Sequence, residues 1–186
     1  MFVRQWMTCP PSMLLADAPI GDALRFMESR EIDHLAVLGV SGLEGLVTRE
    51  MLRAALKTDP WAPRRPLVLG AAVAAPPITI APSETMERAV QLLVERSVPA
   101  LAVIDGGRLA GTLAVADALR ALASILGPPE LGARVVVTVP AGGDLLEEVR
   151  RRAGGLVVRS LAAFEEPGGE RQVVVRLRGR SSPSAA

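Results

Sequence analysis

Residues that carry redox, metal and acid–base chemistry are scarce in this chain of 186 residues. It has one cysteine, Cys9, one histidine, His34, and no tyrosine. One cysteine cannot form a disulfide within the chain, and one cysteine with one histidine cannot supply the four ligands of a Cys/His zinc site. A Cys9–His34 catalytic pair is formally possible, but nothing near Cys9 indicates an activated nucleophile. Because the carboxylates form no recognisable pair either, we expect a protein that is not an enzyme and has no cofactor or metal.

Long apolar runs and an excess of one charge are also missing. The most apolar segment, residues 67–82, is interrupted by Pro76 and Pro77 and falls short of the ~18 residues that a spanning helix needs. Residues 1–8 carry one arginine and no apolar signal-peptide core follows them. The net charge is +1, from 21 basic and 20 acidic residues, which gives no general attraction to nucleic acid or anionic membranes. We therefore expect a cytoplasmic protein with no nucleic-acid or membrane partner.

An ungapped duplication is the strongest pattern in the sequence. Gly45 and Gly111 lie 66 residues apart, and the same offset aligns further residues from about position 7 to position 56. Chance would not keep one register over such a span, so the chain contains two copies of one structural unit. The aligned pairs include Pro10 with Pro76, Ala23 with Ala89, Arg30 with Arg96, and Leu35-Ala36-Val37 with Leu101-Ala102-Val103.

Each copy has the pattern of a β-α-β-β-α unit. An extended apolar stretch at residues 13–15, repeated at 78–80, is followed by a cap residue, Asp17 or Ser83. An amphipathic helix follows, with apolar residues at i, i+3, i+4 and i+7. The buried Leu-Ala-Val strand, a glycine turn, a short strand and a second helix complete the copy. One copy has too little core to be stable alone, so we expect the two copies to pack together.

Several of these segments resemble the CBS domain family. The resemblance lies in Val3-Arg4-Gln5-Trp6-Met7-Thr8, in the two Leu-Ala-Val strands, and in Gly45-Leu46-Val47-Thr48. Two such copies resemble a CBS pair, or Bateman module, over roughly residues 1–126. The resemblance implies two clefts between the copies that bind adenine nucleotides and so control a partner, and it implies a homodimer.

A smaller unit follows Pro128-Pro129. A strand at 135–137 and a helix at 144–153 are followed by two strands, 156–164 and 172–178, joined by a Pro-Gly-Gly turn. This β-α-β-β order resembles the front half of an ACT domain, which has a ferredoxin-like fold. The layout resembles that of bacterial acetoin-utilisation-type regulatory proteins. Because the truncated unit leaves a sheet edge and an apolar face uncovered, dimerisation is its simplest purpose.

The predicted fold class is mixed α/β (α+β). The expected segments are the first CBS repeat at 1–57, a linker at 58–68, the second CBS repeat at 69–126, a linker at 127–133, the ACT-like unit at 134–180 and a disordered tail at 181–186.

CBS nucleotide sites follow the pattern Gly-x-x-Thr/Ser-x-x-Asp/Asn from a strand into a helix. The resemblance implies that the hydroxyl and the helix N-terminus attract phosphate, that the carboxylate binds the ribose, and that the apolar strand edges sandwich the base. Each copy keeps half of the pattern, with Gly45, Thr48 and Met51 in the first and Gly111, Ala114 and Asp117 in the second.

The two halves have different interpretations. Thr48 is best explained as a helix cap, because Met51 cannot hold a ribose. Asp117 has lost its capping partner to Ala114, so a reciprocal capping box does not explain it. An acid in the first helical turn still gains ~0.3–1 kcal/mol from the helix dipole. This role and a ribose role both stay open, and a single binding cleft should be the one around Asp117.

His34 precedes a buried strand at the position that Ala100 occupies in the second copy. It either contacts phosphate across the cleft or, as we favour, is a half-buried structural histidine. The candidate nucleotide-binding residues are Asp117, Thr48, Thr79, Val98, Pro99, Ala100 and His34. The leading hypothesis is a regulatory, ligand-sensing protein whose effector is AMP, ADP, ATP or a related adenosyl compound. The alternative is a structural, dimerisation and protein-interaction module with degenerate nucleotide sites.

Overall fold

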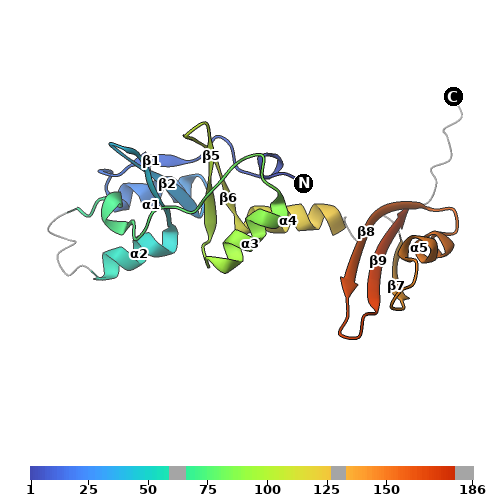
Figure 1. Cartoon of the computed structure of the whole chain (residues 1–186). Helices are drawn as coiled ribbons and strands as arrows, with labels where there is room; N and C mark the ends of the chain where they lie inside the picture. The colour runs from blue at the N-terminus through green and yellow to red at the C-terminus, as the bar shows by residue number, and fades with distance from the viewer. Residues whose placement is uncertain (59–65, 127–132, 179–186) are drawn as a thin grey trace, which may run out of the picture. The chain divides into compact units, whose positions relative to one another are not determined.

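The computed structural model describes residues 1–58, 66–126 and 133–178, and these form two compact units, Met1–Leu119 and Arg120–Ala186 (Figure 1). The expected tail at 181–186 and most of both expected linkers lie outside the described residues.

The first repeat has the predicted β-α-β-β-α order. Its elements are β1 (Met13–Leu15), α1 (Ile20–Ser29), β2 (His34–Gly39), β3 (Gly42–Thr48) and α2 (Arg49–Thr58). The strands form a sheet in the order β1-β2-β3, in which β1 runs parallel to β2 and β3 runs antiparallel to it.

The second repeat has the same architecture. Its elements are β4 (Thr79–Ile80), α3 (Met86–Glu95), β5 (Ala100–Asp105), β6 (Arg108–Ala114) and α4 (Val115–Leu126). Val103 pairs with Gly111 as Val37 pairs with Gly45, and both hairpins shift register directly after that valine. The duplication seen in the sequence is therefore a duplication of strand register as well.

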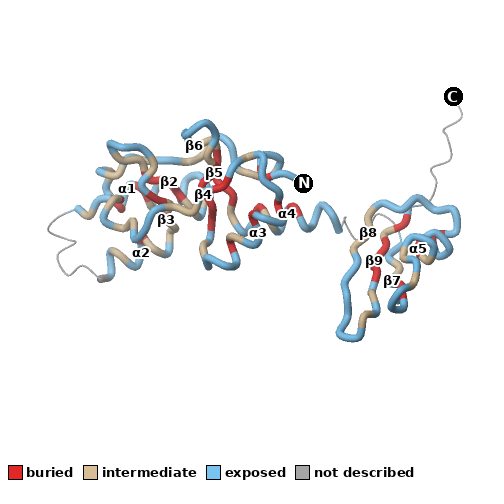
Figure 2. Tube along the Cα trace, in the orientation of Figure 1, coloured by how far each residue is buried: buried red, intermediate tan, exposed pale blue. Residues whose placement is uncertain are grey.

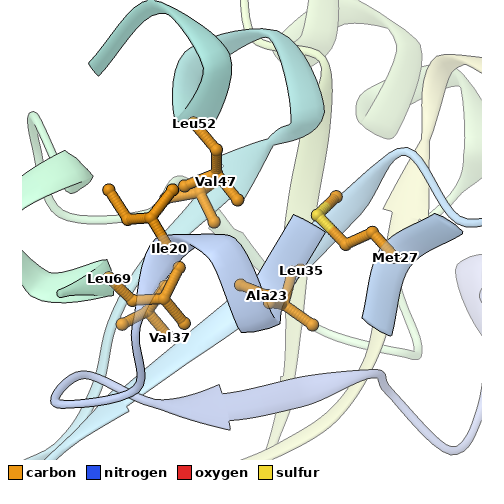
Figure 3. Packing of buried hydrophobic residues seen from close by; sticks show 8 residues of the cluster. All are labelled: Ile20, Ala23, Met27, Leu35, Val37, Val47, Leu52 and Leu69. Atoms are coloured by element: carbon orange, nitrogen blue, oxygen red, sulfur yellow. The ribbon is translucent and has the colours of Figure 1, made fainter. Parts of the chain in front are cut away.

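The core of the first repeat follows from the helical period of α1. Ile20, Ala23 and Met27 lie on one face and pack on Leu35 and Val37 of β2, where all five side chains are buried (Figure 3). Burying each of the larger side chains contributes about 1.5–3 kcal/mol. Val47 of β3 and Leu52 of α2 close the same cluster.

Each repeat is completed by the segment that leads into the other repeat. The short helix η1 (Val3–Gln5) precedes the first repeat but joins the second, where the Val3 amide donates to the Glu84 carbonyl at 2.9 Å. The short helix η2 (Leu69–Ala72) precedes the second repeat but joins the first, where Leu69 is buried in the core shown in Figure 3. The two copies are thus interlocked.

The exchanged segments lie directly against two glycines that correspond in the repeats, Gly45 and Gly111. A Cβ atom on Gly111 would lie 2.8 Å from the Thr8 carbonyl oxygen, and one on Gly45 would lie 2.5 Å from Cγ1 of Val73. Such distances are too short for a Cβ contact, so a side chain at position 111 would displace the Thr8 backbone and one at position 45 would displace the Val73 side chain.

The helix caps predicted at Asp17 and Ser83 are wrong. Helix α1 begins after Pro19, which makes no side-chain cap, and α3 begins after Thr85, whose Oγ1 accepts from the Arg88 amide at 3.2 Å. The reason is the exchange of segments. Pro19 bridges to Val68 and Thr85 bridges to Phe2, and both are held extended, so each helix starts two residues later than predicted.

The C-terminal unit has the predicted β-α-β-β order, with β7 (Ala133–Val139), α5 (Leu145–Ala153), β8 (Val157–Glu165) and β9 (Arg171–Arg178). The sheet is antiparallel in the order β7-β9-β8. Helix α5 covers one face of the sheet, where the alternate residues of β7 and β9 are buried (Figure 2). Asp144 caps α5 by accepting from the Leu146 amide at 2.9 Å, and Gly154 ends it with a φ of 54°.

Candidate functional site

A cleft of about 860 Å³ lies between the two repeats. It is formed where β2 begins, where β3 turns into α2, where α3 ends and where β6 turns into α4. Its lining comes from both copies and consists of Asp33, His34, Thr48, Arg49, Glu50 and Met51 from the first repeat, and Leu93, Val94, Ser97, Val98, Pro99, Ala114, Val115 and Ala116 from the second.

The two walls of the cleft are related by the duplication but differ in chemistry. Asp33 corresponds to Pro99, and Arg49 and Glu50 correspond to Val115 and Ala116. The first repeat therefore supplies the charged wall and the second repeat an apolar one. Such a cleft suits a ligand with a flat apolar end and a charged end.

The charged wall carries an ion pair. Arg49 Nε donates to Asp33 Oδ1 at 2.8 Å, and a second Arg49 nitrogen contacts the same oxygen. The Asp33 side chain is 81% exposed, so solvent screens the pair and it is worth about 0.2–1 kcal/mol. Arg49 can exchange this weak partner for an anion at little cost. The sequence interpretation missed Arg49, although it directly follows the candidate Thr48.

Thr48 lines the cleft and also caps α2. Its Oγ1 accepts from the Met51 amide at 3.2 Å, which is the capping role expected for it. The N-terminus of α2 and the Arg49 side chain therefore lie beside one another on the charged wall.

Asp117 does not line this cleft in the described conformation. Its side chain is 1% exposed, and Oδ2 accepts from the Ala114 amide at 2.7 Å. A capping box has two hydrogen bonds, and one of them is present here. The Asp117 carboxylate accepts from the Ala114 amide before the helix, although residue 114 has no hydroxyl to form the other. A ribose could reach Asp117 only after its carboxylate turned away from that amide.

His34 joins the repeats. Its Nε2 lies 2.9 Å from Oγ1 of Thr112, a buried residue of β6. Burial lowers the pKa of His34, and the nearby Asp117 and Asp33 carboxylates act in the opposite sense. This environment favours a neutral imidazole, in keeping with the structural role favoured for it from the sequence.

The remaining candidates divide between the cleft and other places. Val98 and Pro99 line the apolar wall. Ala100 is buried at the start of β5. Thr79 lines a separate pocket of about 430 Å³ with Ile80, Glu84 and Arg88. The structure thus brings together His34, Thr48, Val98 and Pro99, and it places Ala100, Asp117 and Thr79 elsewhere.

The C-terminal unit has a smaller pocket of about 350 Å³ between the β7–α5 loop and α5. Asp144 occupies the helix N-terminus, Glu147 and Glu148 add negative charge, and Arg151 is held by Glu148 at 2.6 Å. This charge distribution does not favour the carboxylate of an amino acid.

Two negative findings concern only the residues that the structure describes. Among them no group of three or more His, Cys, Asp or Glu side chains could hold a metal ion. None of their helices combines the length and apolarity required to cross a membrane.

The family model of the CBS domain matches residues 3–58 and 70–124, and the chain belongs to this family. One curated relative that it matches is the chloride channel protein ClC-Ka of Rattus norvegicus, with 25% identity over 138 residues. That match covers 68% of this chain but only 20% of the relative, so the chain corresponds to a small part of the channel protein.

Three solved structures are similar to the region of the repeats. CBSX2 in complex with AMP is 24% identical, with a TM-score of 0.57 over 67% of this chain and 97% of that one. An acetoin utilization protein (AcuB) from Vibrio cholerae is 23% identical, with a TM-score of 0.59 over 68% and 93% of the two chains. A CBS domain pair/ACT domain protein from Thermotoga maritima is 26% identical, with a TM-score of 0.53 over 68% and 100%.

Proposed function

We propose that this CBS pair is a cytoplasmic ligand-sensing regulator, without catalytic activity, that binds an adenine nucleotide or a related adenosyl compound in the cleft between its repeats. The observation that carries the proposal is the composition of the cleft, whose charged wall comes from one repeat and whose apolar wall comes from the other. A ligand that contacts both walls binds one arrangement of the repeats better than any other, and so biases it. The AMP complex of the similar CBSX2 supports the choice of ligand class.

The proposed orientation follows from the two walls. The base packs on the apolar wall at Val98, Pro99 and Val115, and the phosphate lies toward the N-terminus of α2. Arg49 exchanges Asp33 for the phosphate, because a charge-assisted contact to phosphate is stronger than a solvent-screened surface pair. Asp117 binds the ribose after its carboxylate turns from the Ala114 amide.

The signal passes to a homodimer or to a protein partner. Apolar side chains on the helices of the CBS pair are exposed, with Val94 at 72% and Leu119 at 61%. We infer that a second copy or a protein partner covers exposed apolar side chains of this kind.

The test is a thermal-shift titration with AMP, ADP, ATP and S-adenosylmethionine, followed by calorimetry of the ligand that stabilises most. A ligand at 100 times its Kd should stabilise the protein by about 2.7 kcal/mol. Asp117→Ala should abolish binding. Equal affinities for wild type and Asp117→Ala would remove Asp117 from the site.

One observation favours the alternative, a structural and interaction module with degenerate nucleotide sites. The nucleotide pattern is split between the copies, and Asp117 is already engaged with a backbone amide. A melting temperature that none of the four ligands changes would favour this alternative.

A further inference from the structure

The sheet of the C-terminal unit has an open edge at β7. Within the described residues β7 pairs with β9 along its whole length and with no strand on its other side. Every second amide and carbonyl of β7 therefore points away from the sheet without a strand partner. The sequence of this strand, Ala-Arg-Val-Val-Val-Thr-Val, is rich in β-branched residues and contains no proline or lysine that would protect an edge.

The opposite edge of the sheet is different. Strand β8 shifts register against β9 between Val158 and Ser160. A bulge of this kind twists the edge and disfavours pairing with a further strand. Of the two edges, β7 is thus the regular one and the better template.

The sequence of β7 suits an antiparallel copy of itself. Val135 packs against the cluster under α5, in which Val137 and Val139 are buried, while Arg134, Val136 and Thr138 lie on the other face. A partner strand must keep this alternation, so residues of the same face must lie opposite each other. If Val136 of one strand lies opposite Val136 of the other, this condition is met, and every residue from Ala133 to Val139 has a residue of the partner strand opposite it.

The same register also suits the charges. It places Arg134 of one copy opposite Thr138 of the other, and Val135 opposite Val137. A register centred on Arg134 would place two arginines opposite each other, which is unfavourable, and would match fewer residues.

We propose that β7 pairs antiparallel with β7 of a second copy of this chain, with the two Val136 residues opposite each other, so that the sheets of both copies become continuous. The proposal rests on the homodimer proposed above and adds a contact at β7 to it. It does not depend on nucleotide binding, because every residue that carries it belongs to the C-terminal unit.

Single cysteines in the full chain test the pairing, with Cys9→Ser in every variant so that no other thiol reacts. Val136→Cys should form a covalent dimer rapidly on mild oxidation or with a short thiol cross-linker. Val157→Cys is the matched control, since it is the same substitution at similar exposure, 49% against 44%, on the far edge of the same sheet. It should cross-link at least tenfold more slowly.

The register is tested by mixing two variants. In the proposed register residue 134 of one copy lies opposite residue 138 of the other. A mixture of Arg134→Cys and Thr138→Cys should therefore form more disulfide-linked dimer than either variant forms by itself. Equal rates for Val136→Cys and Val157→Cys, no preference for the mixed pair, or a monomer by light scattering in reducing buffer would each overturn the proposal. A thermal shift with nucleotide on the same variants distinguishes this outcome from failure of the proposed function, because ligand binding does not depend on β7.

Discussion

His34 Nε2 lies 2.9 Å from Thr112 Oγ1, and this hydrogen bond ties the first strand of one hairpin to the second strand of the other. Thr112 also exchanges backbone hydrogen bonds with Thr8, at 2.8 and 3.1 Å. One buried residue of the second repeat thus holds both the first repeat and the exchanged N-terminal segment.

Replacing Thr112 by valine should destabilise the chain by about 1–3 kcal/mol. The substitution keeps the shape of the side chain but leaves a partly buried imidazole nitrogen without its partner. Urea denaturation measures the loss. Thr79→Val is the matched control on an exposed threonine and should stay within about 0.5 kcal/mol of wild type. Similar losses in both variants would contradict a special role for the His34 bond.

The free energy of unfolding should decrease as the pH falls below about 6.5. Burial lowers the pKa of His34 from its ordinary value of 6.5, so the unfolded chain binds more protons than the folded chain in this range. The stabilisation is complete above pH 6.5 and is lost as the pH falls toward the folded pKa. The slope cannot exceed about 1.4 kcal/mol per pH unit for one group.

His34→Gln should remove this slope between pH 7.5 and 5.5, because His34 is the only histidine. Urea denaturation of both proteins at several pH values provides the measurement. If the free energy of unfolding depends on pH with the same slope in the variant, carboxylates and not His34 cause the effect.

Filling the cleft should block nucleotide binding. Ala116 lines the cleft in the first turn of α4, and Ala116→Trp should weaken affinity by at least about tenfold by occupying the space of the ligand. Ala123→Trp is the control on an exposed position of the same helix. Calorimetry that finds the same affinity in both variants would place the ligand elsewhere.

Thr85→Ala should cost about 0.5–2 kcal/mol, whereas Ser83→Ala should cost little. The reason is that Thr85, and not Ser83, accepts from an amide of α3. Thermal denaturation of the two variants compares the sites directly, and a larger loss from Ser83→Ala would contradict the observed cap.

A chain that ends at Leu126 should keep the nucleotide affinity of the full chain within about twofold, because all residues that line the cleft precede Leu119. If the C-terminal unit reads the ligand, its removal should abolish the effect of nucleotide on assembly while binding persists. Such coupling is reciprocal. If nucleotide changes the affinity of the C-terminal unit for its own ligand, that ligand changes the affinity for nucleotide by the same factor. Loss of nucleotide binding on truncation would show that this unit contributes to the site.

The element order was predictable because it depends on local patterns. The period of α1, the Leu-Ala-Val strands and the glycine turns are each visible within a few residues, and the offset of 66 residues allowed every element to be identified twice. The same holds for β9, where the alternation visible in the sequence matches the burial of Val173, Val175 and Leu177.

The caps and the site were less predictable because they depend on contacts between distant segments. Pro19 and Thr85 are fixed by bridges to Val68 and Phe2, which no local pattern reveals. The sequence named Thr79 and Thr48 as candidates without assigning either to one of the two expected clefts, and the strands that carry them open onto different pockets. Arg49 was missed because its only signal is its position next to Thr48.

The interlocked segments also affect how the protein is made. The segment of Val3 and Thr8 leaves the ribosome before the first repeat, yet its partners Glu84 and Thr112 are synthesised only after that repeat. The first repeat in turn lacks Leu69 until translation has passed the junction between the copies. The first repeat can thus complete its core once Leu69 has emerged, whereas the N-terminal segment lacks its partners until Thr112 has been synthesised.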